Sequence, residues 1–191
     1  KPGMRLLDIG CGWGSLLRHA AEHHGVQGVG LTVSAEQAAH VRAALAHLPV
    51  EVRLADYRSF NAAGGERFER IASVGMFEHV GRRNYPAFFD MARRCLSDDG
   101  LMLLHTIGKN LPRGGVDPWI DRYIFPNGEL PAMSDVLEQA ETRFVVEDVH
   151  DFGADYDLTL MAWHANFQAA WPCFAERYGE RFRRMWRYYL L

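Results

Sequence analysis

The stretch that most constrains the fold lies near the start of the chain, at residues 6–14. It reads Leu-Leu-Asp-Ile-Gly-Cys-Gly-Trp-Gly, an apolar run that ends in an acid and then in alternating glycines. Residues 15–24, which follow, have a helical pattern. A strand, a glycine turn and a helix are the usual way in which an α/β sheet presents a nucleotide-like ligand at the carboxyl ends of its strands. The glycines let the backbone turn sharply and approach the ligand closely.

The spacing of these glycines indicates the kind of ligand. Dinucleotide enzymes use G-x-G-x-x-G to hold a pyrophosphate, whereas this turn is G-x-G-x-G with an acid two residues before the first glycine. The variant resembles the first motif of the S-adenosylmethionine-dependent methyltransferases, whose ligand carries an amino acid and a sulfonium in place of phosphates. We predict a nucleoside-type site formed by Asp8, Gly10, Cys11, Gly12 and Gly14. The alternative is a purely structural tight turn.

Strand and helix patterns alternate along the chain, which predicts an α/β fold with a mostly parallel sheet and helices on both faces. The predicted strands cover about residues 5–9, 27–31, 50–54, 70–74, 101–106 and 144–150, with a turn at 98–100. The predicted helices cover about residues 15–24, 35–47, 85–96, 133–141 and 158–191, the last broken near Pro172. Residues 107–131 are irregular, and so long a loop in a compact domain is usually functional or a lid.

Composition excludes several classes of protein. The net charge of −3 provides no global basic field, so nucleic acid is not an expected partner. The three cysteines lie far apart without a C-x-x-C pair, which argues against a disulfide framework or a zinc site and fits a reducing compartment. We see neither a signal peptide nor a membrane-spanning stretch. We expect one cytoplasmic domain over residues 1–191, cut from a longer protein at both ends.

Polar residues after the second and third predicted strands are candidates for the rest of a nucleoside site. Thr32 and Gln37 stand where an acid often meets the ribose, and both can form hydrogen bonds through neutral groups. Ser34, three residues before Gln37, also matches a capping box, and both roles can hold together. Asp56 can accept from the exocyclic amine of adenine while Tyr57 stacks on the ring. The alternative is a turn acid beside a packing tyrosine.

Two further strand ends carry chemistry. The fourth predicted strand runs into Glu78-His79, and the fifth ends in His105-Thr106-Ile107. Neighbouring ends of parallel strands meet at one edge, so an acceptor and a donor would face the reactive end of the ligand. A core histidine is the alternative for His105. The spacing of these groups matches no short metal site that we know, so we predict no metal.

Aromatic residues in the second half of the chain allow two interpretations. Trp119, Tyr123 and Phe125 can line a slot for a ligand and steady positive charge, or can form the core under the loop. The arginine-rich, aromatic segment at 177–189 can lie on an anionic surface or can be a packing helix with a solvated arginine face. For this helix we favour packing.

Taken together, these motifs resemble the cyclopropane-fatty-acyl-phospholipid synthases, within the wider group that includes the mycolic acid cyclopropane synthases. The resemblance covers essentially the whole chain and looks closer to the bacterial phospholipid enzymes. The later motifs are more specific than the glycine turn. The motifs that carry the resemblance lie at residues 7–14, 34–37, 56–58, 73–81, 104–108, 117–120, 123–128 and 152–157.

The resemblance implies a Rossmann-like class I methyltransferase fold, whose last antiparallel strand would lie outside this chain. It implies transfer of a methylene group from S-adenosylmethionine across a cis double bond of an unsaturated phospholipid, at the inner face of a bacterial membrane, by a homodimer in peripheral contact. The family holds a bicarbonate ion as base. Glu78, His105 and Tyr156 match the side chains that bind it, and Ile107 matches a backbone contact.

This chemistry is physically coherent. An alkene is a poor nucleophile, so the sulfonium must be held in line with it at close range. Attack gives a carbocation, and the new methyl must lose a proton to close the ring, which requires a base. Two cysteines familiar in the family would lie upstream and downstream of this chain. The rival functions are a related methyltransferase without ring closure and a non-catalytic nucleoside-binding module.

Overall fold

The computed structural model describes residues 1–60, 65–112 and 115–191 of the 191-residue chain. Positions 113–114 of the expected irregular segment therefore lie outside the described residues. The chain divides into two compact units. Unit 1 comprises residues 1–116 and 127–146, and unit 2 comprises residues 117–126 and 147–191. The expectation of one domain over the whole chain stays a prediction.

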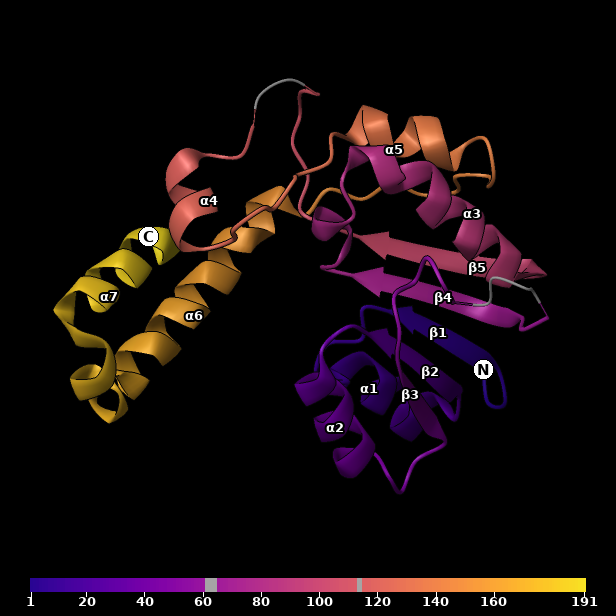
Figure 1. Ribbon diagram of the computed structural model, residues 1–191, viewed down its shortest axis with the longest axis horizontal. Coiled ribbons are helices and arrows are strands. Elements are labelled where there is room, and N and C mark those ends of the chain that lie inside the picture. The colour runs from indigo at the N-terminus through magenta and orange to yellow at the C-terminus, as the bar shows by residue number, and fades with distance from the viewer. Residues whose placement is uncertain (61–64, 113–114) are drawn as a thin grey trace. The chain divides into compact units, whose positions relative to one another are not determined.

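Unit 1 is built on a five-stranded sheet in the order β3-β2-β1-β4-β5 (Figure 1). Every pairing in it is parallel, as the alternating pattern predicted. The chain moves outward from β1 to β3 and then returns to place β4 beside β1, which makes a topological switch point. The strands are β1 (Arg5–Ile9), β2 (Gln27–Thr32), β3 (Val50–Leu54), β4 (Phe68–Val74) and β5 (Leu96–His105).

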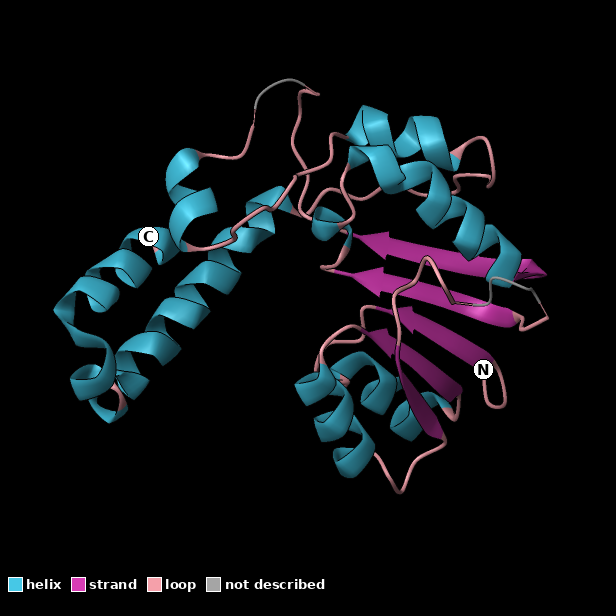
Figure 2. Ribbon diagram, viewed as in Figure 1, coloured by secondary structure: helices cyan, strands magenta, loops and turns pink. Residues whose placement is uncertain are grey.

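Helices cover both faces of this sheet (Figure 2). One hydrophobic cluster contains Leu17 and Val41 from α1 and α2 together with Leu6 of β1. The other contains Phe88 of α3 together with Leu7 of β1. Neighbouring β1 residues thus enter opposite clusters, which is why this strand is apolar almost throughout. The helices are α1 (Ser15–His24), α2 (Ala35–Ala44), α3 (Tyr85–Cys95) and α5 (Met133–Ala140).

The turn expected at residues 98–100 lies inside β5. Phe68 pairs with Leu96, but Arg70 pairs with Leu101, so five steps along β5 match two steps along β4. The extra residues form a bulge, which is a point where one strand bends away from its partner. A Cβ atom on Gly100 would lie 2.6 Å from Leu96 Cγ, so the bend needs glycine.

The strand predicted at 144–150 is wrong. No residue of this segment is in a strand, and Val145 is 85% exposed. The β-branched residues have the right local propensity, but a strand also needs a neighbour to complete its hydrogen bonds. No described strand pairs with these residues, which instead lead from unit 1 into unit 2.

Unit 2 is helical, with α4 (Pro118–Tyr123), α6 (Tyr156–Ala170) and α7 (Ala175–Leu190). A 3₁₀ turn at Trp171–Cys173 separates α6 from α7, which confirms the break predicted near Pro172. Trp119 lies edge-on to Tyr188, with ring centroids 4.8 Å apart. The aromatic side chains of unit 2 therefore pack on one another. The rings that join α6 to α7 belong to Phe167, Trp171, Phe174, Phe182 and Trp186.

Within the residues that the structure describes, no helix combines the length and the apolar composition that a bilayer crossing needs.

Candidate active site

The glycine turn adopts the backbone conformation that its sequence requires. Gly10, Gly12 and Gly14 have φ angles of 86°, 54° and 81°, all in the left-handed region that favours glycine. A Cβ atom at Gly10 would lie 2.6 Å from Met76 Cγ, whereas one at Gly12 would meet nothing within 4 Å. The amides of Gly10 and Cys11 both donate to the carbonyl of Leu31. The turn is therefore fixed to the end of β2, and its backbone borders open space at Gly12.

The N-terminus of α1 follows this turn without a capping side chain. Gly14 occupies the N-cap position, and the first turn of α1 contains no acidic residue. Free backbone N–H groups and the helix dipole favour a negatively charged group at such an end. This end of α1 is therefore suited to a carboxylate or another anion.

Asp8 is a buried carboxyl group just before the turn. It is 2% exposed, and among the described residues it has neither an ion-pair nor a hydrogen-bond partner. Burial raises its pKa to about 7. Burial and the Asp8 charge together raise the pKa of the Cys11 thiol to about 11. Asp8 thus keeps its hydrogen-bonding capacity unused beside the open turn.

Thr32 and Gln37, the neutral groups expected to meet a ribose, form a hydrogen bond with each other at the end of β2. The Thr32 hydroxyl donates to Gln37 Oε1 over 2.8 Å and accepts from the Ser34 amide. Ser34 Oγ accepts from the Gln37 amide, which confirms that Ser34 caps α2. The side-chain amide nitrogen of Gln37 has no partner in the described part of the chain. Contact of this pair with a ribose stays a prediction.

Asp56 and Tyr57 both have partners within the protein. The Arg58 guanidinium donates to both carboxylate oxygens of Asp56, at 3.0 and 2.7 Å, and holds the pKa of Asp56 below its usual range. Tyr57 is half-buried and lies edge-on to Phe88, and burial raises the pKa of its hydroxyl. An adenine amine would therefore share the Asp56 carboxylate with Arg58, and the adenine contacts stay predictions.

Glu78 is the most unusual polar residue of unit 1. It lies in a 3₁₀ turn, Phe77–His79, just after β4, and it is 8% exposed. Its Oε1 accepts from the Ile107 amide over 2.7 Å. Its Oε2 is buried and has no hydrogen-bond partner among the described residues. A buried acceptor without a donor is costly, so Glu78 can receive a donor that the described residues do not supply.

The structure joins the ends of β4 and β5, as predicted from the sequence. Val74 pairs with His105, and the Gly75 amide donates to the His105 carbonyl over 3.0 Å. The bond from Ile107 to Glu78 lies just beyond this pair. The Ile107 amide is thus engaged by Glu78, and the His105 side chain is exposed. Their contacts with bicarbonate stay predictions.

Tyr156 begins α6 in unit 2 and lies edge-on to Trp163, with ring centroids 5.9 Å apart. Because Glu78 and His105 belong to unit 1, a meeting of Tyr156 with them stays a prediction. In the described ranges, no group of three or more His, Cys, Asp or Glu side chains is placed to hold a metal ion.

Sequence reasoning missed two contacts of this site. The Glu129 amide donates to the Glu78 carbonyl over 2.9 Å, from the position just after the motif at 123–128. The buried Ser73 hydroxyl donates to the Ile9 carbonyl over 3.2 Å and joins β4 to β1. A hydroxyl in an apolar strand end is the only sequence signal for the second contact.

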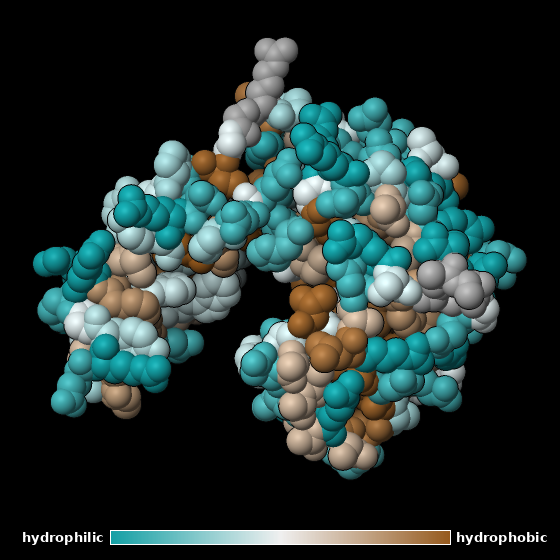
Figure 3. Space-filling view, in the orientation of Figure 1, coloured by the Kyte–Doolittle hydropathy of each residue, from teal (hydrophilic) through white to brown (hydrophobic). Residues whose placement is uncertain are grey.

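Hydrophobic side chains are exposed close to these strand ends. Val33 and Leu54 are 77% and 52% exposed and lie at the carboxyl ends of β2 and β3. Figure 3 shows hydrophobic side chains gathered on the surface over this part of unit 1. The surface beside the glycine turn is therefore partly apolar, which suits a flat ring more than a fully hydrated ligand.

Comparison with known proteins identifies related sequences over the whole chain. Residues 1–191 match the family model described as mycolic acid cyclopropane synthetase. The chain is 52% identical over 190 residues to the cyclopropane-fatty-acyl-phospholipid synthase of Escherichia coli strain K12. The matched region covers 100% of this chain and 49% of that protein. It is 40% identical over 187 residues to cyclopropane mycolic acid synthase 1 of Mycobacterium tuberculosis strain H37Rv, covering 88% of this chain and 64% of that protein. The chain thus spans about half to two thirds of these relatives.

A solved structure shows the same fold. The crystal structure of mycolic acid cyclopropane synthase CmaA1 complexed with SAH and CTAB matches with a TM-score of 0.86 and 37% identity, over 100% of this chain and 72% of that one. The Mycobacterium tuberculosis cyclopropane synthase MmaA2 matches with a TM-score of 0.87 and 33% identity, also over 100% of this chain and 72% of that one. These matches confirm the predicted Rossmann-like class I methyltransferase fold.

Proposed function

We propose that the chain is the catalytic part of an S-adenosylmethionine-dependent cyclopropane-fatty-acyl-phospholipid synthase. The premise is that the chain belongs to the mycolic acid cyclopropane synthetase family, whose model matches residues 1–191. The reaction transfers a methylene group across a cis double bond of an unsaturated phospholipid acyl chain. The relative at 52% identity, whose name states this activity, supports the choice of phospholipid. The observation that carries the proposal is the buried Glu78 carboxylate with one engaged and one unpartnered oxygen.

The residues at the ends of β1, β2 and β3 fit S-adenosylmethionine as the methyl donor. The uncapped end of α1 suits the carboxylate of its amino-acid part. In this proposal Thr32 and Gln37 meet the ribose hydroxyls, and Asp56 and Tyr57 meet the adenine. The solved relative complexed with SAH supports S-adenosylmethionine as the methyl donor.

The residues at the ends of β4 and β5 fit bicarbonate. Glu78 Oε2 is an acceptor in need of a donor, and a bicarbonate ion carries one hydroxyl that can donate to it. The His105 ring, and Tyr156 if unit 2 brings it near, would donate to the other oxygens. The Ile107 amide fixes the orientation of the Glu78 carboxylate. When bound, bicarbonate supplies the base that takes the proton from the new methyl group.

The arrangement accounts for each demand of the reaction. The alkene attacks the methyl carbon and the carbon–sulfur bond breaks, which forms the first new carbon–carbon bond. The base then takes a proton from the new methyl group, and the second carbon–carbon bond closes the ring, so the π bond of the alkene is lost while its σ bond remains. Residues of the β1 and β2 ends orient the donor for this attack. Glu78 and His105 hold the base one strand further along the same edge. The two tasks are thus assigned to neighbouring parts of one sheet edge.

The remaining parts of the proposal follow from the family. We propose that both units form one methyltransferase domain, and that the protein is a cytoplasmic homodimer in peripheral contact with the inner face of a bacterial membrane. Unsaturated phospholipid at that surface is its substrate. The net charge of −3 fits a protein that does not bind nucleic acid.

The test uses the full-length protein with S-adenosylmethionine and vesicles of unsaturated phospholipid, and measures lipid mass and unsaturation by mass spectrometry. The proposal predicts a gain of one CH₂ together with loss of the double bond. A gain of CH₂ with the double bond retained would instead identify a methyltransferase without ring closure. Binding of the methyl donor without any change in the lipid would identify a nucleoside-binding module.

A further inference from the structure

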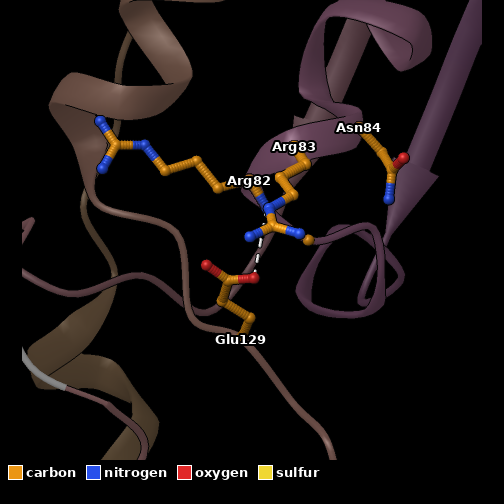
Figure 4. A pocket seen from close by; sticks show the side chains of 5 residues that line it. Arg82, Arg83, Asn84 and Glu129 are labelled. Atoms are coloured by element: carbon orange, nitrogen blue, oxygen red, sulfur yellow. Dashed lines mark hydrogen bonds between the residues drawn. The ribbon is translucent and has the colours of Figure 1, made fainter.

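A hollow of about 730 Å³ lies on unit 1 beside the candidate active site and outside the residues assigned to it. The hollow begins two residues after His79, and the Glu129 amide on its wall donates to the Glu78 carbonyl. Glu78 thus contacts the wall of the hollow through its backbone and the end of β5 through its side chain. The lining residues are Gly81, Arg82, Arg83, Asn84 and Glu129 (Figure 4).

One of the two arginines is already neutralised. Arg82 Nη2 lies 2.9 Å from Asp135 Oδ1, and Asp135 is buried in α5. In Figure 4 the Arg82 side chain extends away from the Glu129 carboxylate, and the dashed line joins Glu129 to the backbone of Arg82. That bond runs from the Arg82 amide to Glu129 Oε2 over 3.2 Å. Arg82 therefore fixes the wall of the hollow and contributes little free charge to it.

The other two charged groups keep most of their capacity. The Arg83 side chain is exposed and makes neither a hydrogen bond nor an ion pair within the described residues. Glu129 accepts the single Arg82 amide and forms no ion pair with Arg83 in that same part of the chain. Gly81, with φ at 74°, allows the turn that brings these groups to one hollow. The hollow thus presents one available guanidinium and one available carboxylate, which form no ion pair with each other among the described residues.

We propose that this hollow binds the zwitterionic head group of the phospholipid substrate, with Arg83 on the phosphodiester and Glu129 on a primary ammonium. A purely anionic ligand would meet the Glu129 carboxylate, and a purely cationic one would meet Arg83. A group that carries both signs a few atoms apart satisfies both side chains. Guanidinium groups pair well with phosphate oxygens, and carboxylates accept readily from ammonium groups. The inference rests on the proposed function, because it assigns the substrate class of that same site.

Lipid competition in the full-length enzyme tests this assignment. Vesicles contain equal amounts of unsaturated phosphatidylethanolamine and phosphatidylglycerol, and the initial rate of cyclopropanation of each lipid is measured. Glu129→Gln removes only the partner of the ammonium, so we expect it to lower the ethanolamine-to-glycerol rate ratio about fivefold, as loss of one exposed ion pair would. Arg83→Gln removes the partner of the phosphate that both lipids share, so it lowers both rates and changes their ratio little.

Arg94→Gln is the matched control, because Arg94 is an exposed arginine of α3 away from the hollow. It should leave both rates and the ratio unchanged. An unchanged ratio in active Glu129→Gln would overturn the assignment of the ammonium. Unchanged rates in Arg83→Gln would overturn that of the phosphate.

A binding measurement separates this inference from the proposed function. Saturation-transfer NMR with the full-length protein compares soluble glycerophosphoethanolamine, glycerophosphoglycerol and inorganic phosphate. Binding of the first, weakened by Glu129→Gln, would support the hollow as a zwitterion site even if neither lipid were converted. Equal binding of all three, or none, would overturn it even in an active enzyme.

Discussion

The two ends of the sheet edge in unit 1 differ in how their polar groups are satisfied. At the ends of β2 and β3, polar side chains have partners close by in the chain: Thr32 pairs with Gln37, and Asp56 pairs with Arg58. At the ends of β4 and β5, Glu78 is buried with one oxygen engaged and the other without a donor in the described residues. The first region is thus a stable surface that a ligand can join, whereas the second is incomplete until a donor arrives.

This comparison explains why the two regions would suit different parts of one reaction. A methyl donor that enters and leaves in every cycle needs a surface that is stable without it. A base held between cycles can complete a buried group that would otherwise be costly. The predictions below test this difference, from the largest expected effect to the smallest.

The largest effect is expected from Glu78→Gln in the full-length enzyme. The amide keeps the shape of the side chain but removes the negative charge and one acceptor, so cyclopropanation should fall at least about 100-fold, as for loss of general-base catalysis. Affinity for S-adenosylmethionine, measured by calorimetry, should change less than about threefold, because an uncharged isostere here leaves the glycine turn intact. If Glu78→Gln lowered both the cyclopropanation rate and the affinity for S-adenosylmethionine, the glycine-turn region and the Glu78 region would not have separate roles.

The glycine turn gives the next effect. Gly10→Ala places a Cβ atom 2.6 Å from Met76 Cγ at a φ of 86°, so it should lower the free energy of unfolding by about 2 to 3 kcal/mol. Gly12→Ala is the matched variant, because its φ is also positive but its Cβ meets nothing within 4 Å. It should cost about 1 kcal/mol. Urea unfolding of the full-length protein measures both, and equal losses would show that Met76 does not limit the turn.

Asp8 predicts a pH dependence of stability. Burial raises its pKa from 3.8 to about 7, so the native state holds a proton that the unfolded state has released. The contribution of Asp8 to the free energy of unfolding is therefore full below pH 3.8 and is lost as the pH rises through about 7. Between pH 6 and 8 the wild-type protein should lose about 1 kcal/mol more stability than Asp8→Asn. Asp99→Asn, at an exposed carboxylate, should follow the wild type, and parallel curves for all three proteins would refute the prediction.

The smallest effect concerns the adenine contacts. Asp56→Asn should weaken S-adenosylmethionine binding about threefold, as loss of one solvent-exposed hydrogen bond to a charged group does. Arg58→Gln releases Asp56 from its ion pair and should leave the affinity equal or slightly tighter. Equal weakening by both variants in calorimetry would show that the Asp56–Arg58 pair acts as a structural turn.

Local signals explain which features could be predicted from the sequence. The glycine turn, the Ser34 cap and the break near Pro172 each depend on a few neighbouring residues, and the structure contains all three. The meeting of Glu78 with residues after β5 was predictable because parallel neighbouring strands end at the same edge. The hydrogen bond from the Ile107 amide to Glu78 Oε1 could not be predicted, because it joins residues 29 positions apart.

The wrong and missed features share a non-local cause. Residues 144–150 have strand propensity, but no described strand pairs with them. The bulge in β5 depends on pairing with β4, and the contact of Glu129 with Glu78 depends on how an irregular segment folds back. Tyr156 was matched to the bicarbonate site through the family resemblance, and its place in unit 2 leaves that assignment a prediction.

The most direct test of the central claim is the bicarbonate dependence of the full-length enzyme. Initial cyclopropanation rates are measured in carbonate-free buffer and after addition of bicarbonate, for the wild type and for Glu78→Gln. If the unpartnered oxygen of Glu78 receives this ion, the wild-type rate rises with bicarbonate and the low rate of the variant does not. A wild-type rate that is independent of bicarbonate, or a variant that responds as the wild type does, would contradict the account.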